Sequence, residues 1–282
     1  MKIKVFFHMI KQRTVRLRTL FLVGLVLLLA ISAVSKVSFS YEPADVYYPN
    51  EQLVYKVKYL FLRVGTLRMI NEGLVDYNNS KYFRLKIFID SASGIPFVNI
   101  HDVYISYVDR NSVPVAFFAW EKKGDYTLET DYLFDNQNKR VSVEIREAYP
   151  DSTRLVEKKQ VPINGIYRDV LSLLFFARQK SGEDYKNITI PTFVLAGQDS
   201  CYFNEIGSTR ELKFKGEKYP VYYLQGRVKF IGIAGIKDDF EGWFSVDAQR
   251  IPLKAKMKAF FGSITLELEH AENWRAGSSI FN

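Results

Sequence analysis

Most of this chain repeats one pattern, in which apolar and polar residues alternate over short runs that are separated by turn-forming residues. In residues 53–59, LVYKVKY, every second residue is apolar, and Lys56 and Lys58 lie between them. Because successive side chains of a strand point to opposite faces, such alternation predicts a strand with one buried face. Similar runs recur almost to the end of the chain. Their close spacing predicts a mainly β protein, a sandwich or barrel, and disfavours alternating strands and helices.

One segment interrupts the strands with a helical pattern, residues 165–180, GIYRDVLSLLFFARQK. We predict a helix over about 166–179, with one broad apolar stripe formed by Ile166, Val170, Leu173, Leu174 and Ala177. Phe175 falls on the other side, so the second half of the helix is apolar almost all round, which indicates burial on more than one side. Its apolar run is far too short to span a bilayer. We therefore expect the helix to pack in or across the concave face of a curved sheet.

The first 40 residues have the composition of a targeting segment. They hold seven basic residues and no acidic one, and an uncharged apolar run covers residues 20–34. Such a run predicts a hydrophobic signal helix, shorter than the roughly 20 residues that span a membrane comfortably. The long basic part leaves two fates open, a cleaved signal peptide or an uncleaved N-terminal anchor that contacts the membrane. In both cases we expect residues 41–282 to be exported to the periplasm as a single β-rich domain, with a candidate seam near 162–184.

The net charge of +8 comes almost entirely from this leader. Residues 41–282 hold 32 basic and 31 acidic residues, so they have little net field to attract a phosphate backbone, and we exclude nucleic acid as a partner. A content of 48% hydrophobic and 15% aromatic residues supplies a sizeable core. Cys201 is the single cysteine, and we expect a small, half-buried residue there.

Motifs that carry known chemistry are nearly absent from the sequence. The three histidines stand alone, and neither a nucleophile elbow nor a glycine-rich phosphate loop occurs. His101 and Asp102 are adjacent, but adjacent strand residues point to opposite faces, so we do not expect them to act as a catalytic pair. The carboxylates at 238–241 lack the spacing of a calcium loop, and we interpret them as a solvated turn. We predict no catalytic residues, no metal site and no cofactor.

Three blocks of the sequence, residues 50–67, 167–178 and 242–268, together resemble the exported bacterial domain-of-unknown-function 3108 family. The resemblance extends over about residues 50–269, and Asn50 departs from the glycine that is usual in the family. It implies an exported, mostly antiparallel β protein of Gram-negative bacteria, and it implies no established reaction. The positions that match are Glu51, Tyr55, Tyr59, Gly65, Asp169, Leu171, Ser172, Phe175, Arg178, Trp243, Asp247, Arg250, Pro252 and Gly262.

Pattern and resemblance together predict a strongly curved antiparallel sheet, an open β-barrel or β-roll of roughly 12–14 strands with one internal helix. We expect several of the matching residues to serve the fold. Asp169 is placed to cap the helix by accepting a backbone N–H, and Arg250 lies close enough to Asp247 to hold the last turn. The other residues to which we assign a structural role are Gly65, Trp243, Pro252 and Gly262.

Functions of different classes remain open at this stage. The first is a binding module, in which the curved sheet encloses a lipid or another apolar ligand in contact with Tyr55, Tyr59, Leu174, Phe175 and Phe176. The alternative is a structural or protein-interaction component of the cell envelope, in which the helix fills the core. A second alternative, an envelope polymer hydrolase, requires carboxylates that converge in a cleft. A continuous apolar cavity of several hundred Å³ favours binding, whereas a closed core favours the structural role.

Overall fold

The predicted strands form one antiparallel sheet of 14 strands in the computed structural model, which describes residues 44–94, 99–228, 238–259 and 262–276. The predicted leader, residues 1–40, lies outside the described residues. The strands are β1 (Glu51–Tyr59), β2 (Leu62–Tyr77), β3 (Ser80–Ser91), β4 (His101–Val108), β5 (Pro114–Lys123), β6 (Tyr126–Asp135), β7 (Arg140–Ala148), β8 (Thr153–Pro162), β9 (Tyr185–Val194), β10 (Gly197–Phe214), β11 (Glu217–Val228), β12 (Asp238–Ser245), β13 (Pro252–Lys258) and β14 (Ser263–Glu272), and the helix is α2 (Val170–Lys180).

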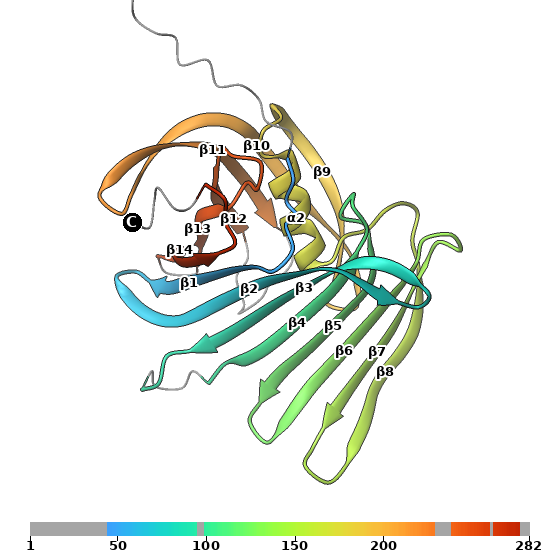
Figure 1. Cartoon of the computed structure of the whole chain (residues 1–282). Helices are drawn as coiled ribbons and strands as arrows, with labels where there is room; N and C mark the ends of the chain where they lie inside the picture. Colours follow the sequence, from blue (N-terminus) through green and yellow to red (C-terminus); the bar gives the residue numbers. More distant parts are fainter. Residues whose placement is uncertain (1–43, 95–98, 229–237, 260–261, 277–282) are drawn as a thin grey trace, which may run out of the picture. The chain divides into compact units, whose positions relative to one another are not determined.

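The strands follow one another in the sheet as they do in the chain, apart from one junction. β1 to β8 run outward in one direction, β9 to β14 return from the other side, and β14 pairs with β1. β8 and β9 are therefore the two edges, and the described residues show no ladder between them. The segment that contains α2 carries the chain from one edge to the other, and α2 lies against β3, β4 and β9 (Figure 1). The prediction of an open, curved antiparallel sheet with one internal helix is confirmed.

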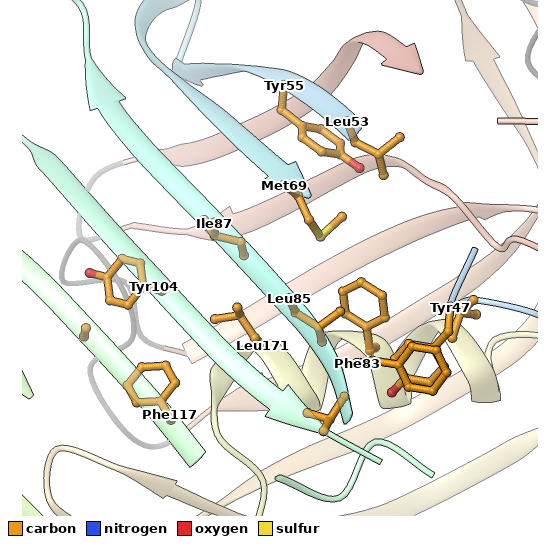
Figure 2. Close-up of a cluster of buried hydrophobic side chains, with 14 of the residues drawn as sticks. Tyr47, Leu53, Tyr55, Met69, Phe83, Leu85, Ile87, Tyr104, Phe117 and Leu171 are labelled. Atoms are coloured by element: carbon orange, nitrogen blue, oxygen red, sulfur yellow. The ribbon is translucent and has the colours of Figure 1, made fainter. Parts of the chain in front are cut away.

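Helix α2 is apolar nearly all round, and two hydrophobic clusters pack on different sides of it. Leu171 and Phe175 join a large cluster that includes residues of β1 to β7. Figure 2 shows Leu171 beside Leu85 in this cluster, and the ring of Tyr47 stacks on Phe83 at 4.2 Å between centroids. On another side of the helix, Ala177 joins a second cluster with residues of β9 to β12. Within the described residues, no helix has the length and apolarity needed to cross a membrane.

The helix begins four residues later than the sequence predicts, at Val170, because the preceding residues are extended. Arg168 pairs with Thr192 of β9 in an isolated parallel bridge. Asp169 is the N-cap, and its Oδ1 accepts the backbone N–H groups of Leu171 at 2.8 Å and Ser172 at 3.0 Å. Hydrogen bonds along the edge of β9 therefore compete with the first predicted turn of the helix.

One strand bends and one local prediction is wrong. β10 is a single strand of 18 residues with bulges on either side of Ile206. Gly207 adopts φ +96° there, and a Cβ at this position would lie 2.1 Å from the carbonyl oxygen of Glu183. The carboxylates at 238–241 lie in strand β12 and not in a turn, because β12 pairs with β11 along its whole length.

A buried ion pair holds α2 against the sheet. Arg178, near the end of the helix, and Glu51, at the start of β1, are both almost completely buried. The two guanidinium nitrogens contact the two carboxylate oxygens at 2.8 Å each, and Nη2 also donates to the carbonyl of Gln249 at 2.8 Å. Burial raises the pKa of the Glu51 carboxyl, and Arg178 opposes that shift. Arg178 therefore connects the end of α2 with the start of β1 and with the loop that contains Gln249.

Substituting Glu51→Gln should destabilise the fold by about 3–5 kcal/mol, because it leaves the Arg178 charge buried without its partner. Chemical denaturation measures this change in the free energy of unfolding. Glu269→Gln is the matched control, because Glu269 pairs with Arg63 at an exposed site, where the loss should be below about 1 kcal/mol. Equal losses in the two variants would contradict the role assigned to the buried pair.

Substituting Asp169→Ala should lower the free energy of unfolding by about 1–3 kcal/mol, since it removes the cap and leaves the buried Ser106 hydroxyl, 2.8 Å from Oδ2, without its acceptor. A thermal melt checks the loss. Asp169→Asn keeps an acceptor oxygen for the helix N–H groups and should retain most of the stability. An unchanged melting temperature in Asp169→Ala would contradict the capping role assigned to this residue.

Candidate ligand-binding cavity

A cavity of about 610 Å³ lies between α2 and the inner faces of the strands that meet at the β1–β14 junction. Its walls come from β1 to β3 on one side and from β10 to β14 on the other. The helix contributes four residues to the lining, Val170, Leu173, Leu174 and Ala177. The volume falls within the range of about 300–1,000 Å³ typical of small-molecule sites.

Small residues at inward positions account for the empty space. Protein interiors normally pack without voids larger than a water molecule, so a cavity of this size requires missing side-chain volume. Gly242 and Ala255 face each other across β12 and β13. Ala177 of the helix and Cys201 of β10 extend the same lining. Larger apolar side chains at Ala177, Cys201 and Ala255 would narrow the cavity, whereas at Gly242 the Phe244 ring already lies 3.2 Å from where a Cβ would be.

The wall of the cavity is apolar, and the charged residues that border it have partners. Asp90 contacts the Nδ1 atom of His101 at 2.8 Å. Glu241 accepts a hydrogen bond from the hydroxyl of Tyr223, and the Lys254 ammonium lies 5.5 Å from the centre of the Trp243 ring. Because an apolar ligand gains most from a wall without uncompensated charge, this lining suits hydrocarbon better than a polar substrate.

Cys201 belongs to this wall, and burial raises the pKa of its thiol to about 12. The side chain is completely buried rather than half-buried. At neutral pH the sulfur therefore stays protonated, and it acts as a small apolar residue and not as a nucleophile.

Only part of the predicted ligand contact lies in this cavity. Leu174 and Tyr59 line it. Phe175, Phe176 and Tyr55 lie outside its lining: Phe175 packs under Arg178, with 4.6 Å from guanidinium carbon to ring centre, and Phe176 packs under Arg168 at 3.9 Å. Tyr55 is buried in the large cluster. The lining residues Leu173, Val170 and Ala177 were not predicted as contacts, although the apolar stripe of the helix already contained all three.

A second cavity of about 320 Å³ adjoins the first at Val170, which lines both. It lies over the inner faces of β4 to β7 and includes polar groups. The Tyr104 hydroxyl donates to Glu121 at 2.9 Å and lies 3.3 Å from Asp102. Burial raises the pKa of the Asp102 carboxyl, and the charge of Glu121 adds to the shift. Among the described residues, no group of three or more His, Cys, Asp or Glu side chains is arranged to hold a metal ion.

Two glycines with predicted structural roles lie where strands or turns approach closely. A Cβ on Gly65 would be 2.5 Å from the carbonyl oxygen of Asp90 on β3. Gly262 adopts φ +74°, and its Cβ would lie 2.3 Å from a methyl group of Leu60.

Two other residues with predicted structural roles lie on β12 and β13. Pro252 begins β13 and borders the cavity. Trp243 packs on Tyr223 with 5.6 Å between ring centres.

Arg250 and Asp247 meet, but through the backbone and not through an ion pair. The Arg250 guanidinium donates to the carbonyls of Val246, at 2.7 Å, and of Asp247. Its backbone adopts φ +49°, in the left-handed region. The Asp247 carboxylate instead accepts the indole N–H of Trp274 at 3.0 Å. The two residues therefore hold the turn before β13 by separate contacts.

Comparison with known proteins assigns the fold and the family, but no activity. A family model described as "Protein of unknown function (DUF3108)" matches residues 54–269. A crystal structure of a β-barrel-like protein of the domain of unknown function DUF1849 from Brucella abortus is similar, with a TM-score of 0.54 and 10% sequence identity over 82% of this chain and 100% of that chain. No curated protein matches the sequence.

The raised pKa of Cys201 predicts that the folded protein resists thiol alkylation at pH 8, because almost none of the thiol is ionised. After unfolding in urea the pKa should return to about 8.5, and the thiol should react readily. Mass spectrometry of maleimide-treated samples measures both states. Rapid labelling of the native protein would contradict the burial of this sulfur.

Proposed function

Because this chain belongs to the DUF3108 family, whose description states no function, we propose a function from the cavity itself: the protein binds a lipid or another apolar ligand and catalyses no reaction. The observation that carries the proposal is a cavity of about 610 Å³ with an apolar wall. An unfilled cavity of this kind destabilises a fold, because its wall loses packing contacts. A hydrocarbon ligand restores those contacts and stabilises the folded state by mass action.

We further propose that binding takes place after export, in the periplasm or on the periplasmic face of the envelope. The support for this location is the basic and apolar leader at residues 1–40. A hydrocarbon chain is poorly soluble in water, so a protein that carries one through an aqueous compartment must enclose it. We infer that the apolar wall shields such a chain from water.

Filling the cavity should abolish binding. Ala255 points inward from β13, and Ala255→Trp places an indole ring in the space between β12, β14 and the helix. We expect the purified, delipidated protein to take up a fluorescent fatty acid or phospholipid, and this variant to bind it at least about tenfold more weakly, a loss of 1.4 kcal/mol. Fluorescence titration measures the affinity, and a thermal melt verifies the fold.

Ala148→Trp is the matched control, because Ala148 lies at the end of β7 and outside both cavities. It should leave uptake unchanged. If the wild-type protein takes up no apolar probe and its melting temperature does not rise with one, the binding proposal fails. The alternative role as a structural or protein-interaction component of the envelope then gains support from the edge strand β8. Its exposed Leu155 and Val156 offer a surface on which a protein partner could pair.

A further inference from the structure

We propose that the turn between β1 and β2 docks on a lipid membrane with anionic headgroups and brings the cavity against it. Three consecutive large apolar residues form the tip of this hairpin: Leu60 and Phe61 in the turn are 54% and 83% exposed, and Leu62, the first residue of β2, is 55% exposed. Single exposed apolar residues are common on proteins, whereas a contiguous group at a projecting tip indicates a contact surface. The hairpin projects from the sheet at the left of Figure 1.

The backbone holds this tip in place, so its exposure is built into the fold. Leu60 adopts φ +56°, a conformation that is costly for leucine. Its N–H donates to the carbonyl of Ser263 at 3.1 Å. The absence of a side chain on Gly262 makes room for the Leu60 methyl group, which would otherwise lie 2.3 Å from a Cβ. The neighbouring strand end therefore supports a turn whose side chains point to solvent.

Apolar surface continues from the tip into the cavity. Tyr59, directly before the tip, lines the cavity, and so does Val64, directly after Arg63. Across the sheet Tyr59 pairs with Ile264 of β14, which also lines it. A hydrocarbon chain that leaves a membrane at the tip therefore meets an apolar path into the interior.

The charge around the tip favours an anionic surface. Residues 56–63, 256–258 and 263–269 hold five basic side chains and two acidic ones. Lys56 and Lys58 share the carboxylate of Glu267, at 3.1 and 2.8 Å, so one positive charge remains in excess there. Lys256 and Lys258 are exposed on β13. Apolar side chains flanked by lysine and arginine are the combination that binds interfacially to anionic lipid, whereas a protein partner would require complementary acidic groups.

A fluorescent probe at the tip tests the docking directly. Phe61→Cys offers an exposed thiol for an environment-sensitive dye, while the native Cys201 is buried and protonated. With vesicles of phosphatidylglycerol and phosphatidylethanolamine, the emission should shift to the blue, and lipids with brominated acyl chains should quench it. Vesicles of phosphatidylcholine alone should give a weaker response, and added salt should reduce the response to anionic vesicles.

Leu74→Cys provides the matched control. Leu74 is 53% exposed and lies on β2, the strand that follows the tip, about 40 Å further along the chain. Both variants carry the same leader, so any attachment through residues 1–40 is common to both. Quenching at 61 but not at 74 supports docking by the tip. No quenching at 61, or equal quenching at both positions, overturns the proposal.

The inference that docking delivers the ligand to the cavity rests on the proposed function. A second pair of variants separates ligand delivery from ligand binding. Phe61→Asp should leave uptake of a soluble fluorescent fatty acid unchanged but slow its transfer from anionic vesicles to the protein by at least about tenfold; Leu74→Asp should change neither. If the tip inserts but the wild-type protein binds no apolar ligand, docking stands and the proposed function fails. If the protein binds ligand and Phe61→Asp transfers it at the wild-type rate, the inference that docking delivers the ligand is overturned.

Discussion

The ion pair between Arg178 and Glu51 determines where the helix lies, and the interior of the protein depends on that position. Charges removed from water are tolerated only when their partners are well placed, and here two carboxylate oxygens, a backbone carbonyl and the Phe175 ring all contact one guanidinium group. A shift of the helix along the sheet would separate these charges in a medium of low dielectric constant. The pair therefore fixes the register of α2 against β1 more sharply than apolar packing alone would.

With its position fixed, the helix divides the interior without filling it. One side completes the cluster that contains Tyr47 and Phe83, and the Asp169 cap places the start of the helix next to Ser106 of β4. The stripe from Val170 to Ala177 faces the β1–β14 junction, where glycine, alanine and cysteine replace larger side chains. The same element thus contributes to the large cluster on one side and to the wall of the larger cavity on the other.

The strands were predictable because each carries its own signal, an alternation that depends only on the local geometry of an extended chain. The helix was predictable for the same reason, and its apolar stripe contained the residues that line the cavity. Phe175 and Phe176 were selected for their aromatic side chains, and they turned out to pack under arginines, because no local pattern tells which strand will cover which side of a helix. The Glu51–Arg178 contact joins positions 127 residues apart, and family resemblance marked both residues without pairing them.

The order of the strands has a consequence for how the protein forms. The first strand pairs with the last, so the ladder between β1 and β14 forms only when the entire domain is available. Contacts between such distant segments are slow to form. Until they form, the unpaired edges of β1 and β14 are exposed and prone to aggregation. Synthesis from the N-terminus produces β1 first and β14 last. The cavity, whose walls meet at this junction, is therefore among the last features to be assembled, and the ligand that we propose for it would favour the final closure by contacting both walls.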